Sequence, residues 1–272
     1  MSWLPIGTAI DRRYVVLGPV GYGGVSVVYQ ATDARQGRTI ALKLLAPRFA
    51  DDPDARRKVY TEAQLTDRLC SPGVPRVYAY GDARLRGCGT VPYVSMELLR
   101  GAVLAGRLAG GPLPWAEAVR VAATVADVLA VAHRRGVVHR DLTAHNVMLT
   151  GTGPKIVDFG AARRVGSGGH PTDDVYALGV LLYQMLTGRS PYHAPGTAPG
   201  LDLTRWYRLA PTPVLLVPGL PRAVAEICRG CMAKRVQERP GSDQVALDLW
   251  AVLDGRRGDC RIAARCPVLE RA

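Results

Sequence analysis

Residues 138–146, with the sequence VHRDLTAHN, contain the side chains that decide how this 272-residue chain is interpreted. They include Asp141 and Asn146, and a second acidic motif, DFG, begins with Asp158 twelve positions after Asn146. Asp and Asn carry the hard oxygen atoms that Mg²⁺ prefers. A separate aspartate can orient a substrate hydroxyl and accept its proton. The two motifs therefore supply candidate metal ligands and a candidate base, although each motif alone is also compatible with an ordinary loop.

Two further candidates lie toward the N-terminus. Residues 21–26 (GYGGVS) form a glycine-rich turn that could bring backbone N–H groups close to phosphates, although such turns are common. No GKS or GKT follows, which excludes a Walker-type loop. Lys43 ends a predicted strand among apolar neighbours, where a buried ammonium needs a partner. Glu62, on the next predicted helix, can supply that partner.

The first part of the chain is predicted to form a small antiparallel sheet with one helix. Asp52 and Pro53 are typical of a helix start, with Asp as the N-cap and Pro in the first turn. Gln36 and Gly37 are typical of a hairpin turn. Runs rich in β-branched residues predict strands over residues 14–17, 25–31, 39–45, 74–80 and 91–97.

The remainder of the chain is predicted to be mostly helical. Gly136 is a natural stop after the longest predicted helix, and the predicted helix over 176–186 is so apolar that we expect it to be buried on all sides. Residues 191–221 hold many prolines and glycines and are expected to be mostly loop. The predicted helices cover residues 115–135, 176–186, 222–234 and 242–253.

These motifs, in this order and on these structural elements, resemble the eukaryotic-like (Hanks-type) protein kinases, and most of all their bacterial serine/threonine branch. The resemblance extends from Ile6 to about Leu253. It is especially close in residues 129–142 (LAVAHRRGVVHRDL), 174–180 (DVYALGV) and 187–192 (TGRSPY). The set is far more specific than any single motif.

The resemblance implies an α+β, bilobal fold. A small antiparallel sheet with one helix would form the N-lobe, and a larger, mostly helical part would form the C-lobe. The expected domains are a lead-in over 1–13, an N-lobe over 14–97, a C-lobe over 98–254 and a basic tail over 255–272.

The resemblance also implies ATP and Mg²⁺ as cofactors and assigns roles to individual residues. Asp141 would be the catalytic base, and Asn146 and Asp158 would be the magnesium ligands. Lys43, paired with Glu62, would hold the α- and β-phosphates. Met96 would be the gatekeeper, with Glu97 and Leu98 in the hinge. The residues expected to contact the nucleotide are Val20, Gly21, Gly23, Gly24, Val28, Ala41, Lys43, Met96, Glu97, Leu98 and Leu149.

The largest departure from the family is the segment after the DFG motif. Only 16 positions separate Asp158 from Asp174, and no Ala-Pro-Glu motif occurs. The platform that docks a peptide in other family members is therefore largely missing. Arg239 matches the arginine that pairs with the lost glutamate. Since an unpaired buried guanidinium is costly, we expect Asp173 or a backbone carbonyl to accept its hydrogen bonds.

A second departure is Thr143, which stands where serine/threonine kinases place a lysine that contacts the γ-phosphate. Our hypothesis is that His145 supplies the missing positive charge, since a nearby phosphate favours the charged imidazole. The alternative is that His145 packs beside the loop. Arg140 would normally contact a phosphate on the activation segment, where only Ser167 and Thr172 remain as nearby hydroxyls.

Two smaller departures concern the N-lobe. Ser26 replaces the last glycine of the loop, and its side chain is expected to restrict a left-handed backbone. Thr66 occupies the position of an apolar spine residue, which we expect to loosen the helix that carries Glu62.

The composition of the chain limits its expected cellular compartment and binding partners. The net charge is +12, but the arginines are scattered and aromatic residues make up only 6%, so nucleic-acid binding is not expected. No stretch approaches the roughly 18 uninterrupted apolar residues of a membrane span, and no secretory signal is predicted. Six cysteines without such a signal favour a reducing, cytoplasmic compartment. Cys228 and Cys231 lie in an apolar helical pattern, so we expect buried thiols in place of a zinc site.

Three functions follow from the sequence. The first is an ATP- and Mg²⁺-dependent kinase that phosphorylates serine or threonine on an unknown protein substrate. The second is an ATP-binding pseudokinase that acts as a scaffold or regulator, an alternative that the missing peptide platform favours. The third is a small-molecule kinase, which would need no peptide platform.

Overall fold

An antiparallel sheet forms the first of two units into which the chain divides. The computed structural model describes residues 4–85, 89–165, 169–192 and 211–255. The first unit comprises Met1–Gly101 with Val157–Ala162, and the second comprises Ala102–Ile156 with Arg163–Ala272. The first therefore contains the DFG motif as well as the sheet. The predicted domain limits remain predictions.

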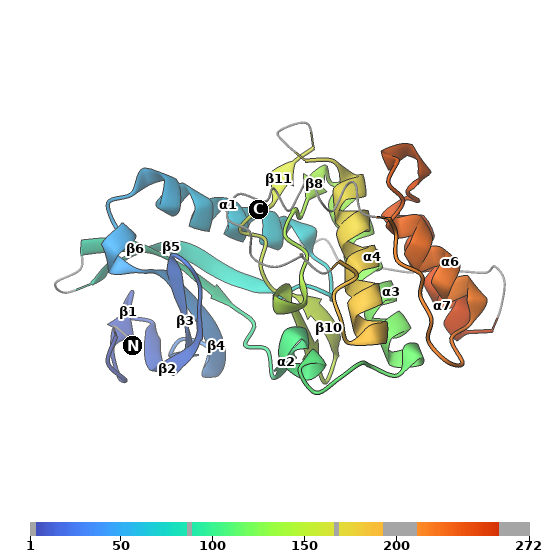
Figure 1. The fold of residues 1–272 in the computed structure, drawn as a ribbon. Helices are drawn as coiled ribbons and strands as arrows, with labels where there is room; N and C mark the ends of the chain where they lie inside the picture. The colour runs from blue at the N-terminus through green and yellow to red at the C-terminus, as the bar shows by residue number, and fades with distance from the viewer. Residues whose placement is uncertain (1–3, 86–88, 166–168, 193–210, 256–272) are drawn as a thin grey trace, which may run out of the picture. The chain divides into compact units, whose positions relative to one another are not determined.

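The sheet of the first unit contains six strands in the order β1-β2-β3-β4-β6-β5 (Figure 1). Every neighbouring pair is antiparallel, and short connections join all successive strands except β4 and β5, between which helix α1 lies. The predicted turn at Gln36 and Gly37 joins β3 to β4, with Gly37 at φ 61°. The strands are β1 (Ala9–Ile10), β2 (Tyr14–Tyr22), β3 (Ser26–Asp33), β4 (Arg38–Leu45), β5 (Val77–Leu85) and β6 (Gly89–Met96).

Two predicted strands had the wrong limits. The first runs on from residue 17 to Tyr22, because β2 keeps pairing with β3 through two register shifts near Gly18 and Gly21. The strand predicted over 74–80 begins later, at Val77, and runs to Leu85. Pro75 lacks the N–H that a strand ladder needs, which accounts for the later start.

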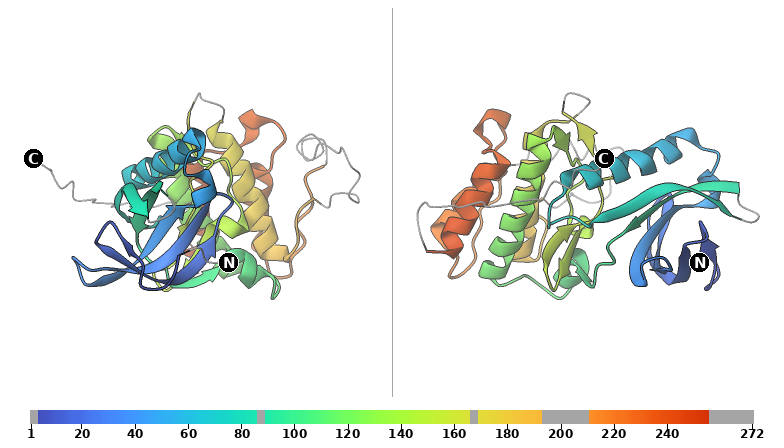
Figure 2. Two further views of the ribbon diagram at one scale, coloured as in Figure 1. Left: turned by 90° about the vertical axis from the view of Figure 1, so that its left-hand side faces the viewer. Right: turned by 180° about the vertical axis from the view of Figure 1, so that it is seen from behind.

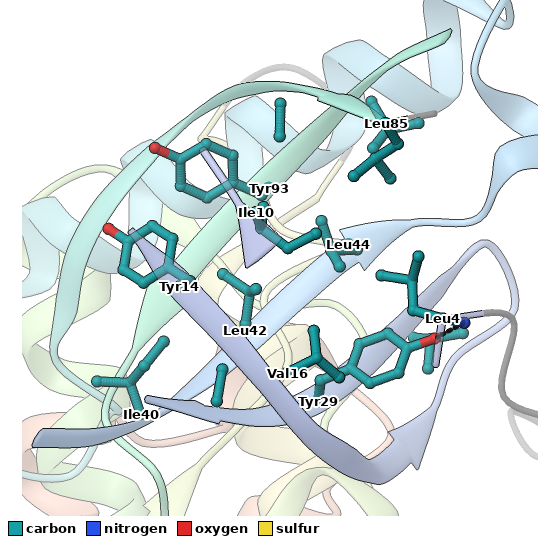
Figure 3. Packing of buried hydrophobic residues seen from close by; sticks show 14 of the residues in the cluster. Leu4, Ile10, Tyr14, Val16, Tyr29, Ile40, Leu42, Leu44, Leu85 and Tyr93 are labelled. Atoms are coloured by element: carbon teal, nitrogen blue, oxygen red, sulfur yellow. Dashed lines mark hydrogen bonds between the residues drawn. The ribbon is translucent and has the colours of Figure 1, made fainter. Parts of the chain in front are cut away.

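The predicted lead-in is packed into this unit. Leu4 and Ile10 are buried in the same core as Tyr14 and Tyr29, and the Leu4 N–H donates to the Tyr29 hydroxyl at 3.3 Å (Figure 3). The Tyr14 ring meets the Tyr93 ring edge-on, with 5.5 Å between the centroids. These aromatic and aliphatic side chains close one face of the sheet.

Helix α1 (Pro53–Leu69) packs beside this sheet (Figure 2). Asp52 caps it as predicted, since its Oδ1 accepts from the N–H groups of Asp54 at 2.9 Å and Ala55 at 3.2 Å. The buried side of α1 includes Val59 and Ala63, which belong to a core cluster shared with strands β4, β5 and β6. This packing fixes which side of the helix, and therefore which acidic side chain, faces β4.

The second unit is mostly helical, and α3 packs against both α4 and α7 (Figures 1 and 2). Two small sheets, with strand orders β10-β9-β7 and β11-β8, complete it. The helices are α2 (Leu104–Leu108), α3 (Trp115–Arg134), α4 (Pro171–Thr187), α6 (Arg222–Cys231) and α7 (Ser242–Leu253). The short strands are β7 (Gly101–Val103), β8 (Val137–Val138), β9 (Val147–Thr150), β10 (Gly153–Ile156) and β11 (Arg163–Arg164).

Helix α3 ends as predicted, with Gly136 at φ 70° just beyond it. Helix α4 was predicted too short, because it begins at Pro171, where His170 and Asp173 form a capping box. It is also not buried on all sides, since Val180 and Tyr183 are only half-buried.

The helix predicted over 222–234 was too long. It ends at Cys231, and the carbonyl of Ala233 accepts from the Arg239 side chain at 2.9 Å.

Helix α7 has the predicted limits, Ser242–Leu253. The last part of the predicted loop, residues 211–221, forms neither helix nor strand, whereas residues 193–210, Ser167, Cys260, Cys266 and the tail beyond residue 255 lie outside the described residues.

Cys228 and Cys231 are buried, unpaired thiols, as predicted. Burial raises the pKa of Cys228 to about 12 and raises that of Cys231 as well. Both are therefore thiols at neutral pH.

In the part of the chain that the structure describes, no helix has the length and apolar character needed to cross a membrane.

Candidate active site

Lys43 lies in the middle of the first unit's sheet. On β4 it pairs in register with Val28 of β3 and Val94 of β6. Its Nζ donates to both carboxylate oxygens of Glu62 on α1, at 2.6 and 2.7 Å. Only 14% of the Lys43 side chain and 13% of the Glu62 side chain are exposed. The partner expected for the buried ammonium is therefore present.

The electrostatics of Glu62 reflect its burial. Burial raises the pKa of Glu62 above its usual range, the Lys43 ammonium opposes this, and the nearby Asp158 carboxylate adds to it. The Lys58 ammonium also opposes the rise, so two acidic groups and two ammonium groups share this part of the first unit.

The DFG turn lies against the same glutamate. The N–H of Gly160 donates to Asp158 Oδ1 at 2.7 Å. A Cβ added at Gly160 would lie 2.8 Å from this oxygen and 3.4 Å from Glu62 Oε2. A side chain at position 160 would therefore displace the aspartate, which explains why glycine occupies this position.

The glycine-rich turn is closed by a hydrogen bond from the Gly23 N–H to the Ser26 carbonyl at 2.8 Å. Ser26 itself is buried and does not have a positive φ, so the expected conflict with a left-handed backbone was wrong. The position uses ordinary backbone geometry that a serine adopts freely. Val20 and Tyr22, at the end of β2, are exposed, and Gly21 and Val28 pair across the two strands.

The predicted hinge follows β6. Met96 pairs in register with Ala41 of β4, and Met96, Glu97 and Leu98 are all half-buried. The backbone N–H of Glu97 donates to the Arg76 carbonyl at 2.8 Å, and the Arg76 N–H donates back to Glu97 Oε2 at 3.2 Å. These two hydrogen bonds tie the start of the predicted hinge to Arg76, the residue just before β5.

The catalytic loop of the second unit carries Asp141, which is exposed. Asn146 lies on the 3-10 turn Ala144–Asn146 and orients this residue, since its Nδ2 donates to the Asp141 carbonyl at 2.7 Å and to Asp141 Oδ2 at 3.1 Å. Leu149 follows on β9, opposite Pro154 of β10. Asn146 thus holds Asp141 both by its backbone carbonyl and by one oxygen of its carboxylate.

The donor atoms fit a magnesium ion. The amide nitrogen of Asn146 is used toward Asp141, which leaves the amide oxygen as the atom that could meet a metal. Asp158 uses Oδ1 toward Gly160, so Oδ2 is its candidate donor. Among the described residues no group of three or more His, Cys, Asp or Glu side chains could hold a metal. Each unit thus contributes one oxygen of the kind that Mg²⁺ prefers, Asp158 Oδ2 in the first unit and the Asn146 amide oxygen in the second.

Asp174 on α4 anchors the catalytic loop, a role that the sequence analysis did not assign. Its carboxylate is 1% exposed and accepts from the backbone N–H groups of His139 and Arg140, both at 2.8 Å. Arg140 has φ 70°, which an L-residue adopts only at a cost in free energy. The sequence signal was an aspartate at the start of an apolar helix, which needs donors when it is buried.

Arg239 has the replacement partners that we expected. Its side chain donates to the carbonyls of Ala233 at 2.9 Å and Thr172 at 3.0 Å. Asp173 is a weaker partner, 3.8 Å away, and the guanidinium lies 4.7 Å from the centroid of the Tyr176 ring. The first turn of α4 therefore takes over from the missing glutamate.

The remaining predicted positions are surface residues or parts of regular helix. Thr143 and His145 are both exposed, and the charge-supplying role of His145 and its alternative, packing beside the loop, both remain predictions. Thr66 is buried and its hydroxyl donates to the Glu62 carbonyl at 2.9 Å, one turn earlier. Helix α1 is unbroken through this residue, and the expected loosening remains a prediction.

Comparison with known proteins identifies the family. The model of the protein kinase domain matches residues 14–173, which include every motif described above from the glycine-rich turn to the DFG turn. This chain belongs to the protein kinase family. The kinase therefore has the α+β, bilobal fold that its motifs implied, with a shortened segment between Asp158 and Asp174.

Its relatives are bacterial serine/threonine-protein kinases. The kinase is 32% identical to PknA of Mycobacterium tuberculosis, over 93% of this chain and 64% of PknA. It is 30% identical to PknL of the same organism, over 92% of this chain and 68% of PknL. It is 33% identical to the DNA damage-responsive kinase RqkA of Deinococcus radiodurans, over 90% of this chain and 40% of RqkA. The chain thus spans about 64% of the length of PknA.

Proposed function

We propose that this chain is a protein serine/threonine kinase that transfers a phosphoryl group from ATP to an as yet unidentified protein substrate. The observation that carries the proposal is the buried Lys43–Glu62 pair, with both hydrogen bonds shorter than 2.8 Å. A buried ion pair contributes little net stability, so folding alone gives little reason to keep it. Membership of the kinase family and the named relatives support the same activity.

Each candidate residue then has a chemical role. Asp141 accepts the proton of the substrate hydroxyl, and Asn146 holds its carboxylate in place for that step. Lys43 binds the α- and β-phosphates, while Glu62 keeps its ammonium oriented. Asn146 and Asp158 would hold Mg²⁺, which would supply positive charge to stabilise the transferred phosphoryl group.

The nucleotide is proposed to contact the residues assigned from the family resemblance. Val20, Gly21, Gly23, Gly24 and Val28 would cover its phosphates, and Ala41, Met96, Glu97, Leu98 and Leu149 would surround its adenine. A cytoplasmic location is also a proposal, supported by the buried thiols of Cys228 and Cys231, which form no disulfide.

The residues present favour the kinase over the two alternative functions. In the part of the chain that the structure describes, Lys43, Glu62 and Asp158 lie together, and Asp141 and Asn146 lie together. The predicted base, metal ligands and phosphate-binding pair are thus all present, although Thr143 stands in place of the family's γ-phosphate lysine. A pseudokinase scaffold that only binds ATP would not need the base at position 141. The shortened segment affects how a protein substrate is held and leaves these residues intact.

The test replaces the proposed base. The substitution Asp141→Asn keeps the shape of the side chain and removes its capacity to accept a proton. With labelled ATP, Mg²⁺ and a generic acceptor protein, we expect phosphate transfer to fall by about 10²- to 10⁴-fold. ATP binding, measured by calorimetry on the same samples, should stay close to wild type.

The matched control is Asp243→Asn, an exposed aspartate on α7. It should transfer phosphate at the wild-type rate. A wild-type protein that binds ATP but labels no acceptor would contradict the proposal and support the scaffold alternative. Equal labelling by Asp141→Asn and wild type would remove Asp141 from the mechanism.

A further inference from the structure

A buried row of hydrogen-bonded side chains crosses three helices of the second unit. Ser242 Oγ of α7 lies 2.9 Å from Nδ1 of His133 on α3. Nε2 of the same ring lies 2.8 Å from Oδ2 of Asp174 on α4. The Ser242 residue is only 4% exposed and the His133 side chain 10%, so the row is largely shielded from water.

The row ends on the backbone of the catalytic loop. Oδ2 of Asp174 accepts from His133 and also from the His139 N–H, and Oδ1 accepts from the Arg140 N–H. The His139 side chain continues the path, since its Nδ1 accepts from the Asp141 N–H at 3.3 Å. Ser242 is therefore linked, through His133 and Asp174, to the segment that carries the proposed base.

The hydrogen-bond chemistry defines what Ser242 does in this row. A carboxylate can only accept, so the His133 nitrogen that faces Asp174, Nε2, must carry a proton. In the neutral ring Nδ1 then has no proton and needs a donor. The Ser242 hydroxyl is placed to be that donor, and it thereby holds the ring in the tautomer and orientation that Asp174 requires.

We propose that Ser242 is a positioning residue for phosphoryl transfer, which acts by holding His133 so that Asp174 can fix the backbone of the catalytic loop. The effect on catalysis rests on the proposed kinase function, whereas the effect on the loop does not. Ser242 does not cap its own helix, because the N-cap of α7 is Gly241 and no side-chain cap hydrogen bond is present. Its hydroxyl is thus directed to His133.

The backbone of Arg140 explains why such support matters. A residue with φ 70° stays in that conformation only when its surroundings hold it there. The Asp174 carboxylate is the group that holds it, and the His133 ring fixes that carboxylate from the other side. Loosening the ring therefore lets the loop relax.

The experiment compares Ser242→Ala with Trp250→Phe. Trp250 Nε1 donates to Asp127 Oδ2 at 2.8 Å, so Trp250→Phe also removes one hydrogen bond between α7 and α3 but leaves His133 untouched. Amide hydrogen exchange of His139 and Arg140 is measured in both variants. We expect both amides to exchange roughly tenfold faster in Ser242→Ala, as the loss of one ordinary hydrogen bond would produce, and at the wild-type rate in Trp250→Phe.

Kinetics give the second measurement. In Ser242→Ala we expect kcat to fall several-fold while the KM for ATP stays unchanged, and Ser242→Thr, which keeps the hydroxyl, to restore kcat. A nitrogen NMR spectrum of His133 in the wild-type protein, which needs no variant, should place the ring proton on Nε2. A neutral ring with its proton on Nδ1 would overturn the proposal.

The outcomes separate this proposal from the kinase function. Unchanged exchange in Ser242→Ala, or equal acceleration in Trp250→Phe, would show that Ser242 has no special link to the loop. If the two amides respond as expected but the wild-type protein transfers no phosphate, the positioning of the loop stands and the kinase function fails.

Discussion

Lys43 in the first unit and Arg239 in the second are both largely buried cations, yet they are satisfied in different ways. Lys43 donates to both oxygens of Glu62 at 2.6 and 2.7 Å. Arg239 is 3.8 Å from the carboxylate of Asp173 and donates mainly to neutral backbone carbonyls. Lys43 has kept a carboxylate partner, whereas Arg239 has no such close partner.

The comparison indicates that a buried guanidinium and a buried ammonium need different kinds of partner. A guanidinium has five donors in a fixed fork and can be satisfied by several neutral oxygens and an aromatic face. Arg239 finds them in the Thr172 carbonyl and Tyr176 ring of α4 and in the Ala233 carbonyl after α6. An ammonium that must hold phosphates needs a charged partner to keep it oriented before the nucleotide arrives. We therefore expect Lys43 to matter chiefly for activity and Arg239 chiefly for stability.

The largest expected effect is on activity, from Lys43→Met. Removing the ammonium should lower phosphate transfer by about 10²- to 10³-fold, the usual loss for one electrostatic contact with the reacting group. Rates with labelled ATP measure it. The control is Arg57→Met, an exposed cation on α1, which should leave the rate unchanged. Wild-type transfer by Lys43→Met would mean that the pair with Glu62 is structural, like the contacts of Arg239.

The second effect is on stability, from Arg239→Ala. We expect the free energy of unfolding in urea to fall by about 2–3 kcal/mol, because the carbonyls of Ala233 and Thr172 lose a charged donor. Arg235→Ala, which removes an exposed arginine four positions earlier, should change it by less than about 0.5 kcal/mol. If Arg239→Ala were as stable as wild type, the replacement partners would contribute nothing.

The smallest expected effect is on the pH dependence of stability, measured by comparing the wild type with Glu62→Gln. Because burial raises the pKa of Glu62, the native chain binds a proton that the unfolded chain releases at its ordinary pKa of 4.5. The stability of the wild type relative to Glu62→Gln should therefore fall as pH rises above 4.5. Urea unfolding at several pH values measures this difference, and a difference that rises with pH would contradict the assignment.

Asp33 provides a control of opposite sign for the pH experiment. Hydrogen bonds from Arg13 lower the pKa of this carboxyl below its ordinary value of 3.8. The wild type should therefore lose stability relative to Asp33→Asn as pH falls below 3.8. Opposite pH trends for Glu62 and Asp33 would distinguish a carboxyl whose pKa is raised by burial from one whose pKa is lowered by hydrogen bonds.

Helix ends and the partners of buried cations were predicted well from the sequence. Asp52 caps α1 and Gly136 ends α3, because caps and stops depend on side chains within a few positions of the helix end. The Lys43–Glu62 pair was also predicted, since the apolar strand around Lys43 required a partner nearby. The same argument predicted the replacement partners of Arg239.

Helix limits and core positions that depend on contacts between residues distant in the sequence were predicted less well. Helix α4 begins five positions earlier than its apolar run, because His170 and Asp173 cap it. Leu4 and Ile10 join the core of the first unit, although the residues around them gave no periodic signal. The conflict expected at Ser26 did not occur, since the turn closes through an ordinary backbone hydrogen bond.

By itself the sequence determined the family and predicted which residues carry the chemistry, because short motifs and local caps are properties of neighbouring positions. Only the tertiary structure decided how Arg239 and Ser242 are used. Arg239 reaches a carbonyl 67 positions away, and Ser242 contacts a ring 109 positions away. Such partners are chosen by the packing of α3, α4 and α7, which satisfies buried donors and acceptors wherever the helices bring them together.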